Sequence, residues 1–105
     1  MDSPDLVERD PDLLLMHRVS TGDDAAIEEL YDRFAPLVFK VAWQFHRGHA
    51  EAEDAVQEIF VRLWQTADRF DPSRAKLVTW VMLIARRHLI DRLRRSSVRP
   101  RPSSI

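Results

Sequence analysis

Arginine is the residue type whose placement in this 105-residue chain points most directly to chemistry. A guanidinium binds phosphate through paired hydrogen bonds and stacks on planar rings, so clustered arginines suit a nucleic acid. The segment 59–105 contains eleven basic and three acidic residues, a net charge of +8, and we predict that it faces a polyanion. Its basic residues on a predicted turn, the helix after it and the tail are Arg69, Arg74, Lys76, Arg86, Arg87, Arg92, Arg94, Arg95, Arg99 and Arg101.

Two aromatic residues, Phe70 and Trp80, are interleaved with these charges. If exposed, their rings form a stacking surface for unpaired bases, worth about 1–3 kcal/mol per base. The alternative is that both rings pack in the core. The apolar stretch around Trp80 favours the core for that ring, whereas the polar loop around Phe70 leaves both interpretations open.

The segment 1–58 has the opposite charge, with fourteen acidic and five basic residues, a net charge of −9. One interpretation is that the chain has two surfaces for two kinds of partner; the other is that the halves attract one another within the fold. Asp54, Gln57 and Glu58 recur at the end of this segment at helical spacing, and Arg62 continues the pattern just beyond it. Such a polar strip can contact a partner helix. Spacing alone favours an ordinary solvated face.

The residue types that catalysis or metal binding requires lack the necessary spacing. His46 and His49 are three residues apart, but Gly48 interrupts the helix that would align their rings. The carboxylates of 51–58 do not follow the spacing of a calcium loop, and no serine lies in a nucleophile motif. We therefore expect neither an enzyme nor a metal or cofactor site.

Punctuation by aspartate, glycine and proline divides the chain into four predicted helices and no strand, an all-α fold. Asp10 and Pro11 signal the start of the first helix, and Asp23 or Asp24 that of the second, in which Pro36 predicts a kink or a short break. The apolar first half of the last helix is expected to be central to the core. The predicted helices span 10–20, 23–48, about 50–66 and about 75–95, with a turn over 67–75, a helical domain over 10–96, a flexible acidic N-terminus over 1–9 and a linker or tail over 97–105.

Length and composition restrict the class of protein further. The length fits one small domain, and no apolar run reaches the roughly 18 residues that a membrane span needs. The first residues are acidic and polar, so we expect no secretory signal. The absence of cysteine excludes a disulfide framework and is compatible with the cytoplasm, which is the compartment we expect.

Three segments together resemble the extracytoplasmic-function (ECF) sigma factors of bacterial RNA polymerase. The first segment contains Leu14-Leu15, Gly22-Asp23, Ala25-Ala26 and Leu30-Tyr31. The second contains Ala52-Glu53-Asp54-Ala55-Val56-Gln57-Glu58-Ile59-Phe60 and Trp64. The third contains Phe70-Asp71-Pro72, Arg74, Trp80, Ile84-Ala85-Arg86, Asp91 and Arg94-Arg95. Each segment is weak evidence alone, but their order and spacing make a specific match over 12–96, which corresponds to sigma region two.

The resemblance implies that the third helix binds the coiled-coil clamp helices of the β′ subunit of core RNA polymerase. The residues implied for this contact are Asp54, Gln57 and Glu58, supported by Phe60, Arg62 and Trp64. An anti-sigma factor is a further implied partner, competing for overlapping surfaces.

The resemblance also implies that the loop before the last helix captures a base flipped from the non-template strand of the promoter −10 element. The loop residues implied are Arg69, Phe70, Asp71, Ser73, Arg74 and Lys76. The strand backbone and the duplex junction would then contact Thr79, Arg86, Arg87 and Arg94, while Trp80 and Ile84 hold the helix in place. Arg87 stands where the family often has asparagine, which favours a phosphate contact at that position.

Members of the family carry a second helical domain whose helix-turn-helix recognises the −35 element, and these 105 residues contain none. We expect either an isolated region two or an unusual single-domain relative. The alternative function, from another class, is a helical protein-interaction module without DNA-melting activity, whose basic tail is a solubilising or docking arm.

Overall fold

Helices form nearly all of the part of the chain that the computed structural model describes, residues 10–98. The predicted acidic N-terminus 1–9, and all of the predicted tail after residue 98, lie outside these residues. The elements are α2 (Pro11–Ser20), α3 (Asp24–Phe45), α4 (His49–Gln65), the short 3₁₀ turn η1 (Ala67–Arg69) and α5 (Leu77–Val98). Residues 10–98 contain no strand, so the predicted all-α fold of four helices is confirmed.

The first two helices begin at the predicted aspartates. The Asp10 carboxylate accepts hydrogen bonds from the backbone N–H groups of Asp12 (2.8 Å) and Leu13 (3.2 Å). Asp23 accepts from the N–H groups of Ala25 and Ala26. These contacts satisfy backbone donors that have no partner within the first turn of a helix.

Helix α3 continues through Pro36 without interruption, so the predicted possibility of a break is wrong. Proline removes the N–H that would bond to the carbonyl of Asp32. Both residues are exposed, so this carbonyl is not shut away from water, while Phe34 and Val38 anchor the helix on either side. The helix ends at Phe45 rather than at Gly48, which instead is the N-cap of α4.

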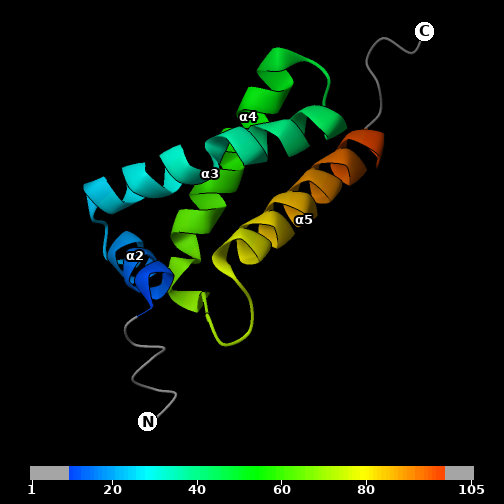
Figure 1. The fold of residues 1–105 in the computed structure, drawn as a ribbon. Coiled ribbons are helices and arrows are strands. Elements are labelled where there is room, and N and C mark those ends of the chain that lie inside the picture. The colour runs from blue at the N-terminus through cyan, green and yellow to red at the C-terminus, as the bar shows by residue number, and fades with distance from the viewer. Residues whose placement is uncertain (1–9, 99–105) are drawn as a thin grey trace, which may run out of the picture.

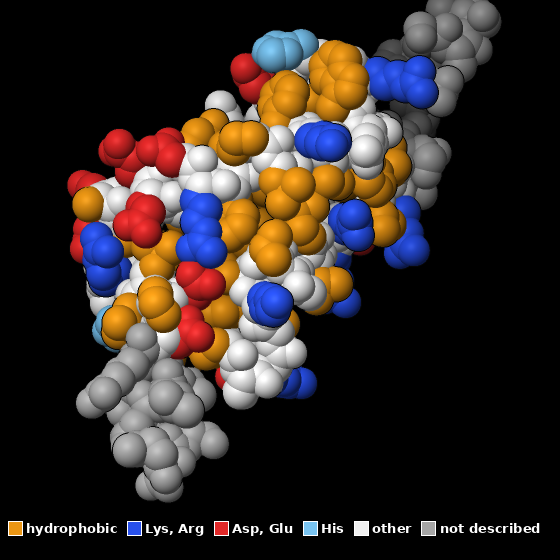
Figure 2. All heavy atoms as spheres, viewed as in Figure 1, with side chains coloured by type: hydrophobic (Ala, Val, Ile, Leu, Met, Phe, Trp, Pro, Cys, Tyr) orange, Lys and Arg blue, Asp and Glu red, His pale blue; other side chains and the backbone are white. Residues whose placement is uncertain are grey.

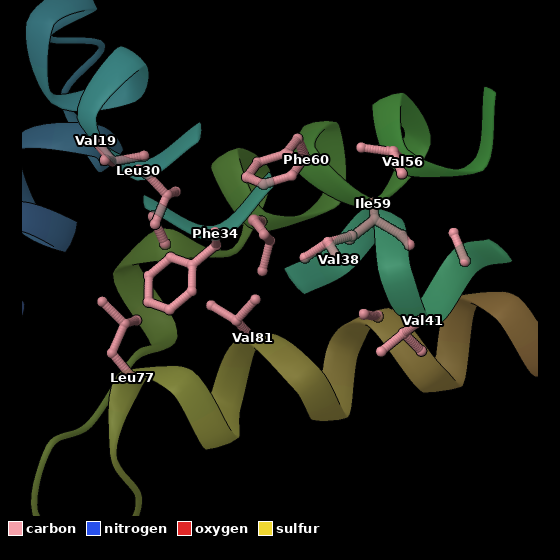
Figure 3. Packing of buried hydrophobic residues seen from close by; sticks show 14 of the residues in the cluster. Val19, Leu30, Phe34, Val38, Val41, Val56, Ile59, Phe60, Leu77 and Val81 are labelled. Carbon is pink, nitrogen blue, oxygen red and sulfur yellow. The ribbon is translucent and has the colours of Figure 1, made fainter. Parts of the chain in front are cut away.

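Helix α3 packs against α2, α4 and α5, and α4 also packs against α5. In Figure 1, α4 crosses behind α3, and the loop from α4 to α5 lies at the end of the molecule near α2. Figure 3 shows that Phe34 and Val38 of α3 point towards residues of the other two long helices, among them Val81 of α5 and Ile59 of α4. These apolar contacts fix how α4 and α5 cross.

Only one face of α5 belongs to the core. Leu77, Val81, Ala85 and Leu89 are buried at intervals of four residues, whereas the side chain of Leu83 is 62% exposed. The prediction that the first half of this helix is central to the core is therefore wrong for its outer face. The reason is that α3 and α4 cover α5 from one side only. Within residues 10–98, no helix is both long and apolar enough to cross a membrane.

We predict that Asp10→Ala lowers the free energy of unfolding by about 1 kcal/mol, because two backbone donors of α2 lose their acceptor. Urea unfolding followed by circular dichroism measures this as a lower midpoint at an unchanged slope. Asp10→Asn is the matched control and should unfold close to the wild type, since its amide oxygen can accept the same bonds. Equal destabilisation by both variants would contradict this role for the cap.

Candidate functional site

A pocket of about 230 Å³ lies where the end of α4, η1 and the middle of α5 meet. Because α4 and α5 cross here, side chains far apart in the sequence line one space. We call it the arginine pocket; its lining residues are Arg62, Thr66, Arg69, Trp80, Ile84, Arg87, His88 and Asp91.

Positive charge dominates the arginine pocket. Arg62 comes from α4, Arg69 from η1 and Arg87 from α5, and none of the three forms an ion pair with any residue of the described part of the chain. Asp91 is the only acidic residue in the lining. Guanidiniums without an internal counter-ion, next to the ring of Trp80, make a site for an anionic and partly planar ligand.

The pocket opens into a shallow groove along the outer face of α5. The lining of this α5 groove includes four residues of the pocket, and Leu83, Arg86, Ile90 and Arg94 are the others. From Trp80 to Arg94 the helix rises about 21 Å. Besides the one acidic residue, Asp91, the groove is lined by apolar and basic side chains, which suits an extended polyanion with apolar parts. Figure 2 shows basic side chains spread along α5, whereas acidic ones gather over the first half of α3.

Phe70 and Trp80 have different surroundings. The ring of Phe70 is 5% exposed and packs edge-on against Trp80, with ring centroids 5.7 Å apart. The ring belongs to the core and also borders a hollow that Pro72 and Lys76 line, so its burial favours the core interpretation, and the predicted contact of Phe70 with a base stays a prediction. Trp80 is half-buried and lines the pocket, held in place by Phe70.

The remaining residues of the predicted loop do not gather at one point. Asp71 accepts hydrogen bonds from the backbone N–H and the hydroxyl of Ser73, and these bonds hold the pKa of Asp71 below its ordinary value. Asp71 thus shapes the turn. Lys76 lines a separate hollow at the start of α2, and Arg74 and Thr79 lie at the surface outside both the pocket and the groove. Of the six loop residues, Arg69 alone lines the arginine pocket.

On α4, a second surface contains the predicted polar strip. Asp54, Gln57, Glu58 and Val61 line a shallow depression there, and we call this set the α4 strip. Val61 is 43% exposed and extends the strip by one turn. Val61 is absent from the strip predicted from the sequence, although its position four residues after Gln57 is the signal that could have identified it.

The three residues predicted to support this contact have different surroundings. Phe60 is 1% exposed and belongs to the core, Arg62 lines the arginine pocket, and Trp64 is half-buried with its Nε1 unpaired within residues 10–98. With about 100° of rotation between successive residues, position 60 points away from the face of 54, 57 and 61, whereas position 64 lies only about 20° around the helix from 57. Support from Phe60 would therefore act through packing, and the supporting role of the three residues stays a prediction.

Glu58 connects the α4 strip to α5. Its carboxylate lies 2.7 Å from Nε2 of His88 and 3.0 Å from Nη1 of Arg92. The other terminal nitrogen of Arg92, Nη2, donates a hydrogen bond to Glu51 at 2.9 Å. Burial raises the pKa of Glu58, but the hydrogen bond from His88 and the charge of Arg92 outweigh burial, and the pKa lies below its ordinary value. No group of three or more histidine, aspartate or glutamate side chains in residues 10–98 is placed to hold a metal.

Comparisons with known proteins give the family. The model of the Sigma-70 region 2 family matches residues 30–99, and the chain belongs to this family. It is 39% identical over 83 residues to the ECF RNA polymerase sigma factor RpoE of Cereibacter sphaeroides, covering 79% of this chain and 45% of that protein. It is 32% identical over 94 residues to the ECF RNA polymerase sigma factor SigK of Mycobacterium tuberculosis, covering 90% of this chain and 50% of that protein.

A solved structure agrees with this assignment. An engineered region 2 of sigmaE, determined by NMR in complex with GTAAAA, superposes with a TM-score of 0.71 at 28% identity, covering 86% of this chain and 93% of that one. The predicted resemblance to region two of ECF sigma factors is thereby confirmed. The chain spans about half the length of the curated relatives it matches.

We predict that the α4–α5 link through Glu58 weakens in acid. A carboxyl group whose pKa is lower in the folded than in the unfolded protein stabilises the fold above its ordinary pKa of 4.5, and this stabilisation is lost as the pH falls through the lower folded value. Glu58→Gln should therefore lose less stability than the wild type between pH 5 and pH 3, measured by urea unfolding at each pH (the window is about one unit on either side of that pKa). Parallel losses in the two proteins would refute this contribution.

Proposed function

We propose that this chain is region two of an ECF sigma factor, which binds core RNA polymerase through the α4 strip and single-stranded promoter DNA through the arginine pocket and the α5 groove. The observation that supports this most strongly is the pocket itself, where three arginines that form no ion pair within residues 10–98 line the same space as a tryptophan ring. In this proposal the chain acts by binding, without catalysis.

The pocket has the chemistry to hold one base extruded from the −10 element. Extrusion costs a few kcal/mol in lost stacking and pairing. Contact with the half-buried Trp80 and with Ile84 offsets part of this cost. Arg62, Arg69 and Arg87 would bind the phosphates on either side of the base and so position the strand.

The α5 groove then takes the rest of the non-template strand. Arg86 and Arg94 would contact phosphates, and the exposed Leu83 and Ile90 would pack against sugars or base edges. The likeness to the engineered region 2 of sigmaE supports this placement, because that protein is described in complex with GTAAAA. In our assignment, Arg74, Lys76 and Thr79 are secondary, since they lie outside the pocket and the groove.

The α4 strip suits a partner helix with basic side chains. Asp54 and Gln57 are exposed and form no side-chain hydrogen bond within residues 10–98, so their polar groups are available to a partner. Val61 adds an apolar contact beside them. We assign this surface to the clamp helices of the β′ subunit, and we place the complex in the cytoplasm with an anti-sigma factor as a competing partner.

We predict that Arg87→Ala weakens binding of single-stranded DNA and lowers the steepness of its salt dependence by about 0.7 in the log–log slope, because one phosphate contact is lost. Fluorescence anisotropy with a labelled pool of random single-stranded oligonucleotides, at several salt concentrations, measures both effects. Arg74→Ala is the matched control because this arginine lies outside the pocket. If Arg74→Ala lowers the affinity for single-stranded DNA and Arg87→Ala leaves it unchanged, the DNA-binding site is the loop before α5 and not the arginine pocket.

We predict that the double variant Asp54→Ala/Gln57→Ala binds core RNA polymerase roughly tenfold more weakly, about 1.4 kcal/mol, while its affinity for single-stranded DNA is unchanged. Competition with a labelled wild-type chain for core enzyme measures the first quantity. Glu28→Ala/Glu29→Ala removes exposed acidic groups from α3 instead and should leave polymerase binding intact. The control removes two negative charges and the test variant one, so a larger loss in the control would mean that net charge, and not the α4 strip, determines the affinity.

A further inference from the structure

The contact between His88 and Glu58 joins the two surfaces described above. His88 belongs to α5 and lines the arginine pocket, whereas Glu58 belongs to the α4 strip. The imidazole is enclosed, with 11% of its side chain exposed, while 47% of the Glu58 side chain is exposed. The enclosed imidazole of His88 therefore holds the carboxylate of Glu58, which faces solvent.

The chemistry of the pair determines which group donates. An ionised carboxylate can only accept, so Nε2 of His88 carries the hydrogen in the 2.7 Å bond to Glu58. This is true of the protonated imidazole and of the neutral tautomer with hydrogen on Nε2. Arg92 binds the same carboxylate oxygen from the next turn of α5. A hydrogen bond from His88 and an ion pair with Arg92, both on another helix, thus restrict the rotation of Glu58.

Glu58 differs in this respect from the other polar residues of the α4 strip. The side chains of Asp54 and Gln57 form no hydrogen bond or ion pair with the described part of the chain, so nothing in it fixes their rotamers. A long glutamate side chain loses rotamer entropy when it binds a partner. Because Glu58 is already held, this loss is largely incurred on folding, before the partner arrives.

We propose that His88 is a positioning residue for the polymerase contact, which it serves by holding the carboxylate of Glu58 in place from α5. The inference rests on the proposed function of the α4 strip. His88 reaches the strip only through Glu58, since it is not among the residues that line the strip and it lines the arginine pocket. A residue on the DNA-binding helix would thus raise the affinity of the chain for a protein that it does not touch.

The test is a double-mutant cycle on the affinity for core RNA polymerase. His88→Ala should weaken binding about three- to tenfold in the wild-type background, the range expected from one lost hydrogen bond to a carboxylate, and should change it little in a Glu58→Ala background. His88→Gln retains an N–H donor and should recover most of the affinity. His49→Ala is the matched control. Nε2 of His49 also lies within hydrogen-bond distance of a glutamate, Glu53 at 3.2 Å, but both residues are exposed on α4, outside the α4 strip.

Two readouts, thermal unfolding and the recovery of affinity in His88→Gln, separate positioning from other effects. Thermal unfolding of each variant identifies loss of the fold, and His88→Gln keeps the test valid if His88→Ala unfolds.

Two results would overturn the proposal. One is an unchanged affinity of a folded His88→Ala variant for core enzyme. The other is an equal loss in the wild-type and Glu58→Ala backgrounds, which would mean that His88 acts through something other than Glu58. Failure of the wild-type chain to bind core enzyme would instead overturn the proposed function, and this inference with it.

Discussion

The apolar contact of α5 with α3 and α4 is the interaction on which both candidate surfaces depend. Leu77, Val81, Ala85 and Leu89 recur every four residues and are buried, so they fix the rotation of α5 about its own axis. Once this rotation is fixed, Arg87 and Trp80 must face the end of α4, and Leu83 must face solvent. The pocket and the groove are consequences of this packing.

The distribution of charge follows from the same arrangement. Part of the attraction between the acidic and basic halves is internal, since Arg92 bonds to Glu51 and Glu58 across the α4–α5 contact. The arginines of the pocket have no such partners within residues 10–98. Attraction within the fold thus accounts for part of the charge asymmetry, and the use of the remaining charge by two kinds of partner stays a prediction. The unpaired arginines keep their electrostatic potential for a ligand, which is the condition for binding a polyanion.

The two aromatic residues Phe70 and Trp80 contribute to the core and to the arginine pocket, respectively. Phe70 is buried and supports Trp80, and Trp80 presents part of its surface to the pocket. A ring in a binding site must be held rigidly, because ordering a mobile side chain on binding costs free energy. The short turn shaped by Asp71 and Ser73 places Phe70 for this purpose.

The sequence by itself determined the four helices, the aspartates at which the first two begin, the class of fold and the segregation of charge. These features depend on local physics: caps, apolar periodicity and composition act over a few residues. The position of Phe70 in the core, the exposure of Val61 and the bond from His88 to Glu58 were decided by the tertiary structure. So was the meeting of Arg62, Arg69 and Arg87 in one pocket. Each depends on the angle at which α4 and α5 cross, and no local pattern encodes that angle, because it arises from apolar contacts between residues distant in the chain.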